Sequence, residues 1–165
     1  MFIIDVIKKE DARGELKMLY RMIEKSLGFV PPHFELFATV DLEAMKEFVE
    51  YNQKMISHEK INANILPFMR LEIAKRECRT YCIAFNTKIV DALNVKDEKT
   101  FDEKQEKLLE KVMKSLYDTS DFTKDDLEEL YLFGFNDKDF YDLLSYASNF
   151  MAKSKMIEVY RKKEA

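Results

Sequence analysis

The stretch NILPFMRLEIAKRECRTYCIAFNTKIVDAL, residues 64–93, is the longest segment of the chain with the apolar spacing of an α-helix. At about 100° per residue, eight side chains between Ala74 and Leu93 share one stripe about 120° wide. Pro67 is compatible with the first turn of such a helix, where a backbone N–H has no partner. The pattern predicts one continuous helix whose apolar stripe contains Ala74, Cys78, Tyr81, Cys82, Phe85, Ile89, Ala92 and Leu93.

Helical patterns also cover the rest of the chain. Gly and Pro occur only three times each, which is too few for the many turns of an all-β fold. We therefore predict one all-α domain over residues 1–165, a bundle of about seven helices. We expect six other helices. One covers residues 11–27 and ends at Gly28, a short one follows Pro32, and one is capped by Asp41. One starts with a capping box over Thr100–Glu103, and the last two start at Thr123 and Asn136.

Composition excludes several classes of function. The net charge of −4 argues against a nucleic-acid partner, because contacts to phosphates need a basic face. No apolar run approaches the length of a membrane span. The apolar stretch at the start of the chain is interrupted by charged residues too early to be a secretory signal. We therefore expect a cytoplasmic protein with reduced cysteines.

The two cysteines of the chain lie four positions apart on the predicted helix. Cys78 falls near the middle of the apolar stripe, where a cysteine packs as a small apolar residue, and we expect it to be buried. Cys82 lies towards the edge, one turn from Arg79 and Asn86. A guanidinium favours the thiolate form, and an amide can donate to sulfur. Cys82 is therefore predicted to be the more reactive thiol, with simple packing as the alternative.

Neither a disulfide nor a metal site is favoured by these spacings. On a continuous helix, positions i and i+4 hold their Cβ atoms about 6 Å apart, whereas a disulfide needs about 3.8 Å. A bridge between Cys78 and Cys82 would require local unwinding. Together with His33 and His58 the cysteines match no zinc spacing. We predict no metal and no cofactor, a structural role for His33, and a surface loop around His58.

Two flanking segments carry a resemblance to a known family. Residues 11–37, DARGELKMLYRMIEKSLGFVPPHFELF, and residues 133–160, FGFNDKDFYDLLSYASNFMAKSKMIEVY, lie on either side of the cysteine segment. In this order the three segments resemble the carboxymuconolactone decarboxylase family, the alkylhydroperoxidase-D-like proteins. The resemblance implies an all-helical fold, assembly as a homo-oligomer (a trimer or hexamer), and a redox partner protein or an external thiol.

The peroxidase branch of that family has a Cys-x-x-Cys pair, a His four positions later and a Glu well upstream. If Cys82 corresponds to the second family cysteine, the first falls on Arg79 and the His falls on Asn86. The Glu falls on or near Pro67. Only one of the four functional residues is therefore present in its family position.

The nearest substitutes for the missing groups are displaced. Cys78 is one residue too early, and Glu72 is about one helical turn too late. Asn86 cannot titrate near neutral pH, so it cannot relay a proton.

Three hypotheses follow from the resemblance. The first is a weak thiol-dependent peroxidase or disulfide reductase centred on Cys82, with an antioxidant role. The second is a non-catalytic protein that binds a ligand or a partner. The third is a decarboxylase of a carboxylated lactone, an activity that does not need the cysteine pair.

Overall fold

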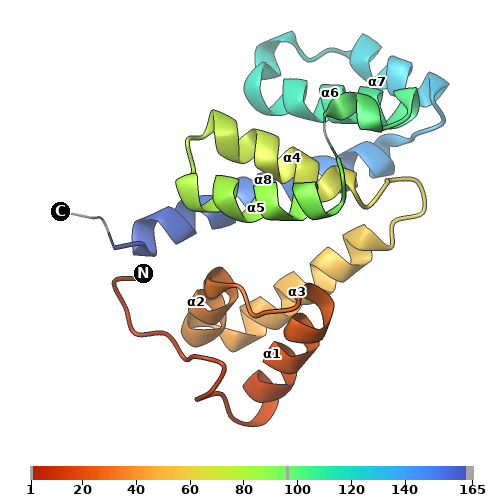
Figure 1. Cartoon of the computed structure of the whole chain (residues 1–165). Coiled ribbons are helices and arrows are strands. Elements are labelled where there is room, and N and C mark those ends of the chain that lie inside the picture. Colours follow the sequence, from red (N-terminus) through yellow and green to blue (C-terminus); the bar gives the residue numbers. More distant parts are fainter. Residues whose placement is uncertain (1, 96, 163–165) are drawn as a thin grey trace. The chain divides into compact units, whose positions relative to one another are not determined.

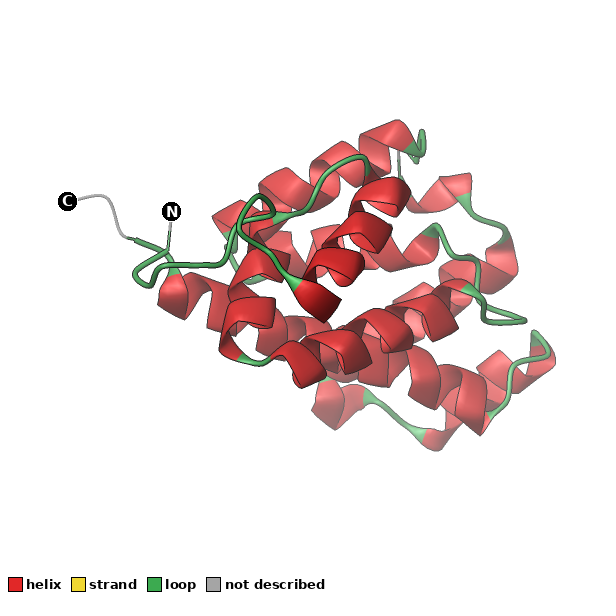
Figure 2. Ribbon diagram, turned by 90° about the horizontal axis from the view of Figure 1, so that it is seen from below, coloured by secondary structure: helices red, strands yellow, loops and turns green. Residues whose placement is uncertain are grey.

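The computed structural model describes residues 2–95 and 97–162. This part of the chain is helical, with short connecting loops and no strand (Figures 1 and 2). The all-α prediction is confirmed. The α-helices are α1 (Gly14–Leu27), α2 (Pro32–Val40), α3 (Leu42–Ile56), α4 (Ile65–Arg76), α5 (Thr80–Ala92), α6 (Glu103–Tyr117), α7 (Lys124–Leu132) and α8 (Asp137–Tyr160), with 3-10 turns η1 (Glu98–Thr100) and η2 (Thr119–Asp121).

The chain forms two compact units. Among the described residues, the first unit comprises residues 2–53 and 159–162, and the second comprises residues 54–95 and 97–158. Helix α3 begins in the first unit and α8 ends in it, so each helix contributes residues to both units. The core of the first unit comes from α1, α2 and α3 and contains Leu16, Leu19, Tyr20, Ile23, Ala38, Met45 and Val49.

Capping residues end and start the helices of the first unit as predicted. Gly28 follows α1 with φ 81°, a left-handed conformation that suits glycine. Its N–H donates to the carbonyl of Glu24 at 2.7 Å. Asp41 precedes α3, and its carboxylate accepts from the N–H of Ala44 at 3.0 Å.

Helix α4 is the most deeply buried helix of the second unit. It packs against α5 and α6. A helix that is apolar on most of its faces belongs in the interior of a bundle. The buried side chains of α4 are Ile65, Leu66, Pro67, Phe68, Met69, Leu71, Ile73 and Ala74.

The prediction of one continuous helix over residues 64–93 was wrong, because the chain leaves the helix after Arg76 and starts α5 at Thr80. The N–H of Arg79 donates to the carbonyl of Ala74 at 2.9 Å, and the N–H of Cys78 donates to that of Lys75 at 3.1 Å. This pair of bonds is a Schellman motif, which ends a helix with a left-handed residue. Cys78 is that residue, with φ 53°. The break accounts for the eighth α-helix in the described residues.

The start of α6 also differs from the prediction. Thr100 belongs to η1, and α6 is capped by Asp102, whose side chain accepts from the N–H of Gln105 at 2.8 Å. The prediction for α7 is confirmed. Thr123 caps it in a reciprocal capping box with Asp126, so two donors that the helix leaves unpaired gain acceptors.

Candidate functional site

The helix break overturns the predicted burial of Cys78. Cys78 is exposed, whereas the apolar stripe predicted it to be buried. Cys82 is buried, with 2% of its surface accessible. The reason is geometric, because a stripe at 100° per residue requires an unbroken helix, and the chain changes direction at Cys78. The cysteines therefore belong to different local structures, the end of α4 and the first turn of α5.

Cys82 occupies the third position of α5, after Thr80 and Tyr81. The N–H groups of a first turn have no partner within the helix. The positive end of the helix dipole lies at the same place and favours a negative charge over a neutral group. The backbone around Cys82 thus provides an environment suited to thiol chemistry.

Arg79 is placed differently from the prediction. It is the residue before the first turn of α5, and its backbone is not helical. Its guanidinium pairs with the carboxylate of Glu77 at 3.3 Å. The buried Nε of Arg79 has no hydrogen-bond partner within residues 2–95 and 97–162. The charge of Arg79 is therefore shared with a neighbouring carboxylate.

Asn86 is almost fully buried, with 1% of its surface accessible. Its side-chain oxygen accepts from Nε of Arg70 at 2.9 Å. Its amide donates to the main-chain carbonyl of Cys82 at 2.8 Å, rather than to the sulfur as we considered from the sequence. Asn86 therefore links a cation on α4 to the first turn of α5.

Sequence reasoning missed Arg70. It stands alone as a charge in the apolar run ILPFMRL, which was the only local signal. Its NH1 group donates to the hydroxyl of Tyr146 on α8 at 2.6 Å, and its guanidinium carbon lies 6.0 Å from the centre of that ring. Three helices of the second unit thus meet at Arg70.

The remaining sequence candidates lie elsewhere. Glu72 pairs with Lys75 at 2.7 Å along the surface of α4, so the structure does not join it to Asn86. His33 is buried and packs edge-on against Phe34, with ring centres 4.5 Å apart. This packing agrees with the structural role that we predicted for His33.

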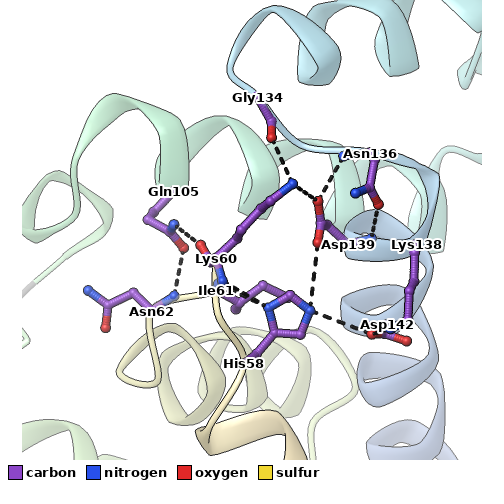
Figure 3. A network of polar contacts seen from close by, with 10 residues as sticks. All are labelled: His58, Lys60, Ile61, Asn62, Gln105, Gly134, Asn136, Lys138, Asp139 and Asp142. Atoms are coloured by element: carbon purple, nitrogen blue, oxygen red, sulfur yellow. Dashed lines mark hydrogen bonds and ion pairs between the residues drawn. The ribbon is translucent and has the colours of Figure 1, made fainter.

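A separate polar network surrounds His58, which the sequence placed in a surface loop. Its Nδ1 accepts from the N–H groups of Lys60 and Ile61, both at 3.2 Å. A ring nitrogen that accepts carries no proton, so the proton lies on Nε2. That nitrogen is 3.5 Å from the Asp142 carboxylate and 3.8 Å from that of Asp139. Figure 3 shows the network with His58, Lys60, Ile61, Asn62, Gln105, Gly134, Asn136, Lys138, Asp139 and Asp142.

The same network fixes the start of α8. Asn136 and Asp139 cap each other's N–H groups at 2.8 and 3.0 Å, as the prediction of a helix start at Asn136 requires. Lys60 donates to Asp139 at 2.9 Å and to the carbonyl of Gly134 at 3.1 Å. Each polar group has a partner from the loop or the helix, so this cluster holds the fold together and we assign it no chemistry.

Comparison with known proteins identifies the fold. No family model and no curated protein matches the sequence. An uncharacterised peroxidase-related protein from Silicibacter sp. TM1040 superposes with a TM-score of 0.74 at 17% identity, covering 95% of this chain and 85% of that one. An uncharacterised peroxidase-related protein with an alkylhydroperoxidase AhpD core, from Ralstonia eutropha JMP134, gives a TM-score of 0.76 at 16% identity, covering 98% and 92%.

The chain therefore has the alkylhydroperoxidase-D-like fold, as the sequence resemblance predicted. At these identities the likeness concerns the fold and does not extend to the activity of either protein. Among the helices described, none combines the length and apolar character that crossing a membrane requires.

Proposed function

We propose that the chain is a thiol-dependent oxidoreductase, a disulfide reductase with weak peroxidase activity, whose site is formed by Cys82 and Cys78. One observation carries the proposal. An exposed cysteine with φ 53°, Cys78, lies two residues before α5, whose first turn contains the buried Cys82. Left-handed backbone costs free energy for any residue with a Cβ, and such strain is found preferentially at functional sites.

The helix break also removes the objection to a disulfide. That objection assumed that both cysteines lie on one helix, where their Cβ atoms are held about 6 Å apart. Because Cys78 lies outside α5, this spacing no longer applies. The regular helix is interrupted between Arg76 and Thr80, which supports the proposal that the two cysteines can be bridged.

The chemistry then proceeds in two exchanges. The Cys78 thiolate attacks one sulfur of an external disulfide, forms a mixed disulfide and releases one thiolate. The Cys82 thiolate attacks the Cys78 sulfur, forms the internal disulfide and releases the second. With a hydroperoxide, the attacking thiolate becomes a sulfenic acid and an alcohol leaves; condensation with the other thiol then releases water. An external dithiol returns both cysteines to the reduced state.

Peroxide reduction is expected to be the weaker activity. Arg70 and Asn86 are hydrogen-bonded to each other, with Asn86 in the position that the resemblance gives to the relaying His. Neither group accepts a proton near neutral pH. A missing proton relay typically lowers a rate about 10²- to 10⁴-fold. Disulfide exchange depends less on such a relay, because its leaving group is a thiolate.

The test is the amount of thiol released in a single turnover. Fully reduced protein, freed of reductant, is mixed with excess oxidised glutathione, and released glutathione is counted per chain. We expect two equivalents from the native protein and one from Cys82→Ser, which stops as a mixed disulfide at Cys78. The Cys78→Ser variant should release little, because Cys82 is buried. One equivalent from the native protein, or equal release from the double serine variant, would refute the proposal.

A further inference from the structure

Arg70 is a partly buried cation whose hydrogen-bond acceptors are both neutral. They are the amide oxygen of Asn86 and the hydroxyl of Tyr146. Lys111, the buried lysine of the same unit, instead contacts the carboxylates of Asp126 at 2.8 Å and Glu129 at 2.6 Å. No carboxylate of the described residues forms an ion pair with Arg70. Its charge is therefore not neutralised by a carboxylate within the described residues.

The guanidinium is also held in a fixed orientation. Asn86 is 1% exposed and Tyr146 is 4% exposed, so both acceptors belong to the packed interior. Two of the five guanidinium N–H groups are used in these bonds. The other three have no partner within the residues that the structure describes. A planar, oriented fork of donors is the group that proteins use for carboxylates.

We propose that Arg70 is the binding site for a carboxylate group of the substrate that reacts at the cysteine pair. The link between the two sites is Asn86, which accepts from Arg70 and donates to the main chain of Cys82. This inference rests on the proposed function, because it assumes that a substrate reacts at the cysteines. It narrows the substrate class to disulfides or hydroperoxides that carry a carboxylate. The anion site itself depends only on the surroundings of Arg70.

Direct binding is measured on the native protein with acetate as the probe. The Nε–H signal of Arg70 is followed by NMR at constant ionic strength, with acetamide as a neutral molecule of matched shape. We expect a saturable shift with acetate, with a Kd on the order of 1 mM, and none with acetamide. An acetate effect that does not saturate, or an equal effect of acetamide, would overturn the anion site.

Substrate selection is measured with a matched pair of disulfides, 2,2′-dithiodiacetate and its diamide. The ratio of their thiol-release rates should fall about tenfold in Arg70→Gln, the change expected for one charge-assisted hydrogen bond. Arg21→Gln removes the same charge from an exposed position on α1 and should leave the ratio unchanged. Arg70→Lys keeps the charge without the planar fork and should recover only part of the preference. An unchanged ratio in Arg70→Gln, or an equal fall in Arg21→Gln, contradicts the proposal.

The two experiments fail separately. Saturable acetate binding without thiol release from either disulfide would disprove the redox function and leave the anion site standing. Thiol release without any acetate response of Arg70 would disprove the anion site and leave the redox function standing. The acetate titration uses native protein, so its outcome does not depend on the folding of a variant.

Discussion

Replacing Cys78 by glycine should stabilise the protein. Cys78 has φ 53° and is exposed, so glycine relieves a strained backbone and removes little packing. A Cβ in the left-handed region costs about 1–2 kcal/mol. The greater freedom of glycine in the unfolded chain offsets about 0.5–1 kcal/mol of that gain. The net expectation is a stabilisation of about 0.5–1 kcal/mol, which for a chain of this size raises the Tm by about 1–4 °C.

The assay is thermal and urea unfolding of reduced protein, with two matched variants. Cys78→Ser keeps the Cβ and should have nearly the stability of the native protein. Ala84→Gly places glycine at an exposed position of the right-handed helix α5, where it should destabilise by about 1 kcal/mol. If Cys78→Gly is no more stable than Cys78→Ser, the left-handed junction between α4 and α5 is not the conformation in solution.

Two further variants test polar networks in the second unit. Hydrogen bonds from Lys111 hold the pKa of Asp126 well below its usual range. Ionised Asp126 therefore stabilises the folded protein fully above the pKa that an Asp has in the unfolded chain, about 4. This contribution is lost as the pH falls from that value towards the lowered pKa of the folded protein. Asp126→Asn should cost about 3 kcal/mol at pH 7 and weaken this pH dependence in urea unfolding. His58→Ala removes the acceptor for the N–H groups of Lys60 and Ile61; losing about 1.4 kcal/mol should speed amide exchange there about tenfold.

Controls distinguish these effects from general damage. Glu128→Gln breaks an exposed pair with Lys124, which should contribute less than about 1 kcal/mol. A cost as large as that of Asp126→Asn would mean that burial of the Asp126 pair is not the cause. For His58→Ala, faster exchange spread evenly over α4 would indicate global destabilisation instead of a local loss at the loop.

The parts of the fold that were predictable have local causes. Gly28, Asp41, Thr123 and Asn136 mark helix ends, and each does so through contacts with residues three or four positions away. Periodicity identified the other helical segments for the same reason. Such signals are contained within a few residues, so one sequence is enough to find them.

The break between α4 and α5 had no such signal. Glycine usually supplies the left-handed residue of a Schellman motif, and here that residue is Cys78. An uninterrupted pattern therefore predicted an uninterrupted helix, and the predicted burial of Cys78 was wrong. Arg70 was missed for another reason: its partner Tyr146 is 76 positions away, a contact that only the tertiary fold creates.

Disulfide mapping shows directly whether Cys78 and Cys82 act as a pair. Reduced native protein is oxidised with one equivalent of hydrogen peroxide, the remaining thiols are alkylated, and peptides are analysed by mass spectrometry. We expect an internal Cys78–Cys82 disulfide as the main product, and an added dithiol should fully reverse it. Oxidation of Cys78 alone, to sulfenic acid or to an intermolecular disulfide, with Cys82 still a thiol, would contradict the pairing.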